Sequence, residues 1–214
     1  NNMKNQSNSI RYQNQNSHTS GNNGGFVVTD IVKKPIIYIY PIEKMDVEVK
    51  LGNPQYLSCT YPKYKNGWSV TADVDGTLVD KNTGKNLYAL YWEGKEVPKN
   101  INLKEGFCVK GKDTATFLEE KLSLLGLSDK EAEEFIIYWL PKMEENNYNY
   151  IRFETKEEQD KSMPLEITPK PDNLIRVMMD WKGLDEKIEV QEQNLETPIR
   201  EGYTVVEWGG TEIK

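Results

Sequence analysis

The stretch DTATFLEEKLSLLGLSDKEAEEFIIYWLP, residues 113–141, decides the fold class, because here the spacing of apolar residues changes from the period of a strand to that of a helix. Asp113 can cap a first helix, and Gly126 is a suitable stop for it. Ser128 and Glu131 form the capping-box pattern of a second helix, which we expect to end near the proline that closes the stretch. The apolar face of the first helix consists of Phe117, Leu118, Leu122 and Leu125.

On both sides of this helical stretch, short apolar runs alternate with polar residues and are separated by Asn-Gly, Asp-Gly and Thr-Gly pairs. This pattern is typical of antiparallel strands joined by tight turns. We therefore expect an α+β protein, a mainly antiparallel β-sheet or sandwich with two helices packed on one side. The expected strands cover residues 26–32, 35–40, 46–51, 56–61, 68–72, 77–79, 87–92, 148–153, 165–168, 174–181 and 203–208.

The chain divides by composition into a tail and a folded part. Residues 1–25 are nearly all polar and cannot bury enough apolar surface to offset the entropy of ordering, so we expect a disordered polar tail. Residues 26–105 form a β-rich part, and residues 106–214 form an α+β part. No linker rich in Gly, Ser or Pro separates these two parts, so we expect one intertwined unit.

Composition excludes several classes of function. The chain has 27 Lys and Arg against 34 Asp and Glu, a net charge of -7, so we expect no nucleic-acid partner. Its single histidine, His18, lies in the polar tail, which argues against histidine-dependent catalysis and histidine metal centres. The sequence has no glycine-rich phosphate loop and no apolar run near the ~20 residues of a membrane-spanning helix, so we expect neither a nucleotide cofactor nor a transmembrane segment. Cys59 and Cys108 are expected to be buried thiols rather than a disulfide.

The motif DVDGTL, residues 73–78, resembles the active-site motif of haloacid-dehalogenase-type phosphatases. The resemblance implies Asp73 as nucleophile and Asp75 as acid/base, beside a magnesium ion. The alternating run before the motif and the strand directly after it favour a hairpin turn instead. Asp73, Asp75 and Asp80 also supply the oxygen ligands that calcium prefers, although their spacing is not that of an EF-hand. They are the candidate calcium ligands, and we expect no other cofactor.

Glu93 and Glu207 each stand beside a tryptophan at the end of a predicted strand. Two carboxylates near aromatic rings could serve glycoside hydrolysis, so this pair is the candidate catalytic site of a hydrolase. Trp68, Trp92 and Trp208 are the candidate binding residues, because an exposed tryptophan ring can stack on a sugar or pack against a partner. Structural roles in the core are the favoured interpretation of both sets.

Five motifs in one order carry a wider resemblance: KPIIYIYP (34–41), DGTL (75–78), YWEG (91–94), YWLPKM (138–143) and TVVEWGG (204–210). In these motifs the chain resembles a family of uncharacterised bacterial proteins, many of which carry export signals. The resemblance implies a single recurring unit over residues 34–210. It implies no activity, so no catalytic residue is carried over from it.

These observations predict a bacterial extracytoplasmic protein, secreted or of the cell envelope, that binds a glycan or a protein partner and is not an enzyme. The polar tail resembles the spacer of a lipoprotein, and because the sequence begins with Asn1 rather than Met, we expect processing and a membrane tether upstream. The alternative is a hydrolase that uses carboxylates alone. It would act on a glycan through Glu93 and Glu207, or on a phosphate ester through Asp73 and Asp75.

Overall fold

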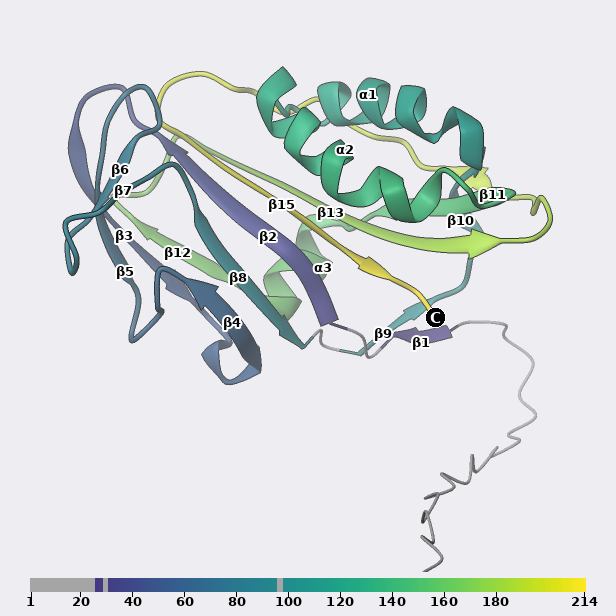
Figure 1. Cartoon of the computed structure of the whole chain (residues 1–214), viewed down its shortest axis with the longest axis horizontal. Coiled ribbons are helices and arrows are strands. Elements are labelled where there is room, and N and C mark those ends of the chain that lie inside the picture. The colour runs from purple at the N-terminus through teal and green to yellow at the C-terminus, as the bar shows by residue number, and fades with distance from the viewer. Residues whose placement is uncertain (1–25, 29–30, 96–97) are drawn as a thin grey trace, which may run out of the picture.

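The computed structural model describes residues 26–28, 31–95 and 98–214, and the tail expected at residues 1–25 lies outside these ranges. The largest element is an eight-stranded sheet (Figure 1). Neighbouring strands run antiparallel except for the pairs β13–β15 and β10–β14, which are parallel. Because β15 pairs with β2, segments from both ends of the described chain lie side by side in one sheet. In spatial order the strands are β14 (Gln191–Glu192), β10 (Glu105–Lys110), β11 (Tyr148–Phe153), β13 (Asn173–Leu184), β15 (Thr204–Glu212), β2 (Ile31–Tyr40), β8 (Leu90–Lys95) and β4 (Leu57–Tyr61).

A second, five-stranded sheet packs against one face of the large sheet (Figure 1). Its strands are β12 (Leu165–Thr168), β3 (Met45–Leu51), β5 (Trp68–Ala72), β6 (Leu78–Asp80) and β7 (Asn86–Leu87). Alternate residues of β3 are buried, because one side of that strand faces the large sheet and the other faces solvent. The core between the sheets includes Val47, Val49, Ile37 and Leu90. Strands β1 (Phe26–Val28) and β9 (Lys99–Ile101) form a separate antiparallel pair. Short 3-10 turns lie at Pro54–Tyr56 and Gly111–Asp113.

Two helices, α1 (Thr114–Leu124) and α2 (Asp129–Met143), cover the opposite face of the large sheet (Figure 1). Leu118 and Leu122 of α1 and Phe135 of α2 are buried against this face. The helices lie over β10, β11, β13 and β15, whereas β8 and β4 extend beyond them (Figure 1). The predicted α+β class is therefore confirmed, and part of the helix-covered face remains open.

The starts and stops of these two helices follow from local sequence. The Ser128 hydroxyl accepts a hydrogen bond from the Glu131 N–H, and the Glu131 carboxylate accepts one from the Ser128 N–H, so the predicted capping box is present. Gly126 follows α1 with a φ of +93°, a conformation that glycine adopts without strain. Helix α2 ends at Met143, near Pro141 as predicted, and the proline lies in the last turn, where a missing N–H costs only one backbone hydrogen bond.

A third helix, α3 (Lys156–Ser162), was not predicted, because its sequence KEEQDKS has no apolar face. The available signal was a second capping box, formed by Thr155 and Glu158. The guanidinium of Arg152 donates two hydrogen bonds to the Glu158 carboxylate, at 2.8 and 2.7 Å, and so ties this helix to β11.

Strand β2 is irregular around Lys34. Its register with β8 shifts between Val32 and Ile36, which marks a β-bulge. Lys34 has a φ of 61°, in the left-handed region that residues other than glycine seldom adopt. The bulge accommodates Pro35, which has no N–H to offer to a neighbouring strand. This irregularity faces the open part of the large sheet, where the candidate site lies.

Candidate functional site

The structure does not bring the two candidate catalytic glutamates together. Glu207 pairs with Ile37, and Ile37 pairs with Leu90, so these three side chains lie on one face of the sheet. Glu93 is three residues beyond Leu90 and therefore points to the other face. Since a glycosidase needs both carboxyl groups at one glycosidic bond, the Glu93–Glu207 site is not formed.

Glu207 has a structural environment. Its side chain is fully buried between the two sheets. One carboxylate oxygen accepts a hydrogen bond from Trp92 Nε1 at 3.0 Å, and the other accepts one from Arg176 Nε at 3.0 Å. The guanidinium of Arg176 also donates to the carbonyl oxygen of Met163 at 2.8 Å. The charge of Glu207 is thus balanced inside the core.

The candidate tryptophans are core residues, in line with the favoured interpretation, and they form no exposed platform. Trp68, Trp92 and Trp208 are 3, 2 and 0% exposed. Each indole N–H is used internally: that of Trp68 donates to the Pro62 carbonyl, and that of Trp208 donates to the Tyr38 hydroxyl. In a strand-rich fold these large rings fill the space between layers.

The motif DVDGTL forms a hairpin turn rather than a phosphatase loop. Strands β5 and β6 are antiparallel, and the Gly76 N–H donates to the Asp73 carbonyl at 3.0 Å. The Asp75 carboxylate accepts a hydrogen bond from the Thr77 N–H, which lowers its pKa. Asp80 is buried and accepts a hydrogen bond from the Thr83 hydroxyl at 2.7 Å. Among the residues that the structure describes, no three Asp, Glu, His or Cys side chains gather to hold a metal ion, so the calcium candidates do not form a set.

Cys59 and Cys108 are both free thiols, Cys59 exposed and Cys108 partly buried. The prediction of a buried thiol is wrong for Cys59, because β4 is an edge strand and this residue lies on the helix side of the sheet, in the part that the helices do not cover.

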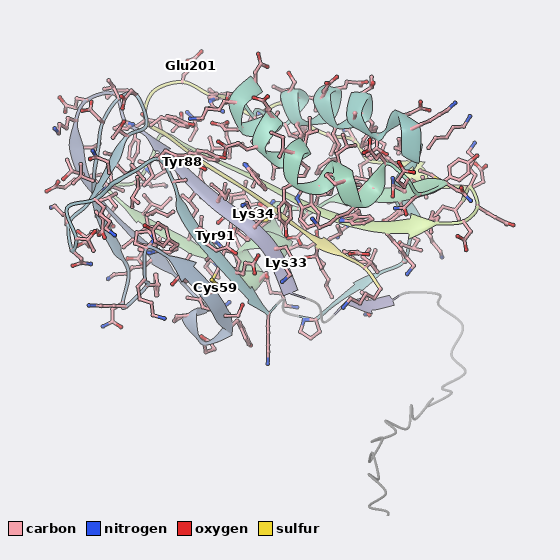
Figure 2. All side chains as sticks on the ribbon, in the orientation of Figure 1. Lys33, Lys34, Cys59, Tyr88, Tyr91 and Glu201 are labelled. Atoms are coloured by element: carbon pink, nitrogen blue, oxygen red, sulfur yellow. The ribbon has the colours of Figure 1, made fainter. Side chains whose placement is uncertain are left out.

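The structure instead gathers tyrosines into a groove between α2 and β4, where Figure 2 labels Tyr88, Lys34 and Tyr91. Two adjoining hollows of ≈ 420 and ≈ 440 Å³ form the groove and share Lys34, Ile36 and Tyr88. We call this surface the tyrosine groove. Its other lining residues include Tyr61, Tyr91, Glu134, Ile137, Tyr138 and Lys142.

Strand register fixes the floor of the tyrosine groove. Ile36 of β2 pairs with Tyr91 of β8, and Tyr91 pairs with Tyr61 of β4. Directly opposed residues point to the same face, so these three side chains form a row across three strands. Glu93 and Cys59 are opposed in the next row. The floor is therefore aromatic in its middle and polar at one end.

Helix α2 forms the wall of the groove, and polar contacts hold it on β2. The Tyr38 hydroxyl donates to Glu134, and the Tyr40 hydroxyl donates to Glu131 at 2.7 Å. The guanidinium of Arg200 donates two hydrogen bonds to the Glu131 carboxylate, at 2.6 and 2.9 Å. Burial disfavours the charge of Glu131, but these partners and its cap contact outweigh burial and lower its pKa. The wall is thus fixed by an ionised, hydrogen-bonded network.

Tyr88, Tyr91 and Tyr138 are neutral hydroxyls at physiological pH. Burial, followed by a hydrogen bond with Glu93, raises the pKa of Tyr91 well above its usual value. Burial and the charge of Glu93 raise the pKa of Tyr138, and burial and the charge of Glu134 raise that of Tyr88. A neutral phenol can both donate and accept a hydrogen bond, so these groups suit a polar ligand.

Charged groups border the same surface. Glu93 accepts a hydrogen bond from the Lys34 N–H at 3.2 Å and lies 3.5 Å from Lys33 Nζ. The Nζ atoms of Lys34 and Lys142 lie 5.4 and 4.0 Å from the centre of the Tyr138 ring. The groove therefore combines aromatic faces, neutral hydroxyls and ammonium groups.

Sequence reasoning missed this groove because its residues come from five separate places in the chain, 34–36, 59–61, 86–93, 134–142 and Trp208. The signal present in the sequence was the high tyrosine content, 12 residues. Which of these tyrosines share a face depends on strand register, and the bulge at Lys34 shifts that register.

No family model, curated protein or solved structure matches this chain. No helix within the described ranges combines the length and apolar character that a membrane crossing needs.

Proposed function

We propose that this protein is a non-enzymatic binding module that holds a glycan chain along the tyrosine groove. The observation that carries the proposal is the exposure of Tyr61 and Tyr88, which are 56 and 54% exposed and line one hollow together with the half-buried Tyr91. A monomeric protein seldom leaves several aromatic rings together in solvent unless they meet a ligand.

The chemistry of the groove suits sugars. A tyrosine ring offers a flat apolar face for the C–H side of a sugar ring, and its hydroxyl offers hydrogen bonds to sugar hydroxyls. Asn86 and Lys34 line the same hollow and add further hydrogen-bonding groups. Such a mixture of an apolar lining with a few polar groups is the usual composition of a ligand site.

The rigidity of the groove supports the same proposal. The Tyr38–Glu134 and Tyr40–Glu131 contacts hold α2 on the sheet, and paired strands form the floor. A site that is ordered before binding loses less conformational entropy when the ligand arrives.

The carboxylates of the groove favour binding over catalysis. Glu93 is engaged by the Lys34 N–H and by Lys33, and Glu134 is engaged by the Tyr38 hydroxyl. A glycosidase requires two carboxyl groups that both reach the scissile bond. We therefore propose no hydrolytic activity at this site.

A glycan-binding role agrees with a location outside the cytoplasm, in the cell envelope or secreted, where polysaccharides are abundant. We propose this location, supported by the polar composition of residues 1–25, which resembles a spacer between an anchor and a domain.

Binding of the full chain to a panel of cell-wall glycan fragments and other polysaccharides, measured by isothermal titration calorimetry, tests the proposal. We expect binding to at least one glycan, and a loss of about tenfold or more in affinity for Tyr88→Ala and Tyr91→Ala, since truncation of an aromatic anchor costs about 2 kcal/mol. Tyr148→Ala, in β11 at the other end of the large sheet, is the matched control and should bind normally. Failure of all glycans to bind, with a folded protein, would overturn the proposal and favour a protein partner.

A further inference from the structure

We infer that the glycan held in the tyrosine groove is anionic and that its carboxylate or phosphate groups pair with Lys34 and Lys142. This inference rests on the proposed function, because it names the chemical class of the same ligand.

Three ammonium groups from two elements surround the tyrosine groove. Lys34 on β2 and Lys142 on α2 both place Nζ over the ring of Tyr138, 5.4 and 4.0 Å from its centre. Lys130, at the start of α2, places Nζ 5.1 Å from the centre of the Tyr88 ring. A contact with an aromatic face positions an ammonium group without neutralising its charge. These charges thus remain available to a ligand.

The carboxylates that border the groove are already engaged. Lys33 offsets the charge of Glu93, and Tyr38 donates its hydroxyl hydrogen to Glu134. Lys34, Lys130 and Lys142 outnumber the one carboxylate that no ammonium group offsets, Glu134, so the balance at the groove is positive, although the whole chain has a net charge of -7. A positive site on an acidic protein attracts anions locally while the rest of the surface repels them, which orients an anionic polymer toward the groove.

The backbone at Lys34 is a second, independent observation. Its φ of 61° is costly for a lysine, and such positions persist where the surrounding structure imposes them, often at ligand sites. Here Pro35 packs against Gly209, where an added Cβ would lie 3.0 Å from the proline Cγ. The fold therefore fixes the backbone from which the Lys34 side chain extends.

The tyrosines of the groove have two different roles. Because Lys34 and Lys142 lie over the Tyr138 ring, this tyrosine positions the ammonium groups. Tyr61 and Tyr91 form the sheet floor and remain for stacking on sugar rings. The two contributions, charge and stacking, can be separated by experiment.

Two polymers with the same sugar backbone test the inference: polygalacturonate, which carries a carboxylate on each sugar, and its fully methyl-esterified form, which is neutral. We expect the full chain to bind polygalacturonate about tenfold more tightly than the ester, as two charge-assisted contacts would produce. Raising the salt concentration from about 50 to about 200 mM should weaken only the binding of the charged polymer. Inorganic polyphosphate provides charge without sugar and should bind more weakly than polygalacturonate.

Matched variants assign the effect to the lysines. Lys34→Asn removes the charge, and asparagine tolerates the left-handed backbone better than other residues do. Lys34→Asn and Lys142→Gln should each weaken the binding of polygalacturonate more than the binding of the ester, so that the two affinities approach each other. Lys112→Gln, a substitution of an exposed lysine in the 3-10 turn before α1, makes the same change in net charge and should bind as the parent does. Tyr91→Ala should weaken the binding of both polymers.

The outcomes separate the two proposals. Equal, salt-independent binding of the two sugar polymers would overturn the anionic assignment and leave the glycan-binding function standing. Binding to neither sugar polymer would overturn both. Polyphosphate bound as tightly as polygalacturonate, with no effect of Tyr91→Ala, would show an unspecific anion site and would also overturn both.

Discussion

Lys34 has a left-handed backbone conformation, which a lysine side chain does not favour. A left-handed φ costs an L-residue about 1–2 kcal/mol. The bulge retains it because Pro35 cannot continue a regular ladder, and because the Lys34 N–H donates to Glu93 at 3.2 Å. At this scale, the local geometry of one residue is set by its neighbours in space.

A comparison of Lys34→Gly with Lys34→Ala measures this strain. Both variants lose the side chain, but only alanine keeps the cost of the left-handed backbone, so the glycine variant should be more stable by about 1 kcal/mol. Urea denaturation gives both free energies of unfolding. At Lys50, an exposed residue of β3, the order should reverse, with alanine more stable by about 0.5–1 kcal/mol. The same order at both positions would contradict a strained Lys34.

At the scale of elements, helices α1 and α2 were predictable because their apolar spacing and caps act within one turn. The Ser128–Glu131 capping box shows this clearly, since both partners lie within four residues. Helix α3 escaped prediction because a polar seven-residue segment becomes a helix only where Arg152 on a neighbouring strand holds Glu158. The pairing of β2 with β8 likewise depends on a bulge that alternation alone does not indicate.

The contacts of Glu131 that keep α2 on the sheet predict that the stability of the protein depends on pH. Glu131→Gln weakens the contacts with Arg200 and Tyr40 and should cost about 2 kcal/mol near neutral pH. Because folding lowers the pKa of Glu131 from its ordinary 4.5, its contribution is complete above that value and is lost as the pH falls through the folded pKa. The difference in free energy of unfolding between parent and variant should therefore shrink below pH 4.5.

Thermal and urea denaturation between about pH 7 and pH 3 measure this difference. The control is Glu133→Gln, an exposed neighbour on α2, which should change little across the range. A difference that stays constant down to the lowest pH would contradict the network.

At the scale of the whole molecule, two different layers cover the two faces of one sheet. Helices α1 and α2 bury part of one face, and the five-stranded sheet buries part of the other. Glu207 is buried on the face toward the second sheet, where it links β15 to Trp92 of β8 and to Arg176 of β13. This buried charge set joins three strands and is a structural feature of the molecule.

Removal of one partner from this buried charge set should strongly lower the free energy of unfolding. Glu207→Ala leaves the buried Arg176 without its main counter-charge and should cost about 3–5 kcal/mol in the free energy of unfolding. The double variant Glu207→Leu with Arg176→Met should recover much of this loss, because apolar residues of similar volume need no counter-charge. Glu212→Ala, at the exposed end of β15, is the control. A stable Glu207→Ala protein would contradict the structural role.

The candidate residues show why site prediction failed where fold prediction succeeded. Alternation correctly separates the two faces of a strand, so Glu93 and Glu207 could be placed on strands. It does not tell which face another layer covers, and Trp92 and Trp208 proved to be buried. The tyrosine groove exists because the helices stop short of β8 and β4, which depends on the packing of the whole sheet.

The sequence by itself determined the α+β class, the two main helices with their caps, most strands, and the hairpin at residues 73–78, because these depend on interactions between near neighbours in the chain. The tertiary structure alone shows that Glu207 pairs with Arg176, that Tyr61 and Tyr91 share a row, and that Lys34 faces α2. The physical reason is that register, bulges and layer coverage arise from contacts between segments far apart in sequence, and these contacts alone create or remove a surface site.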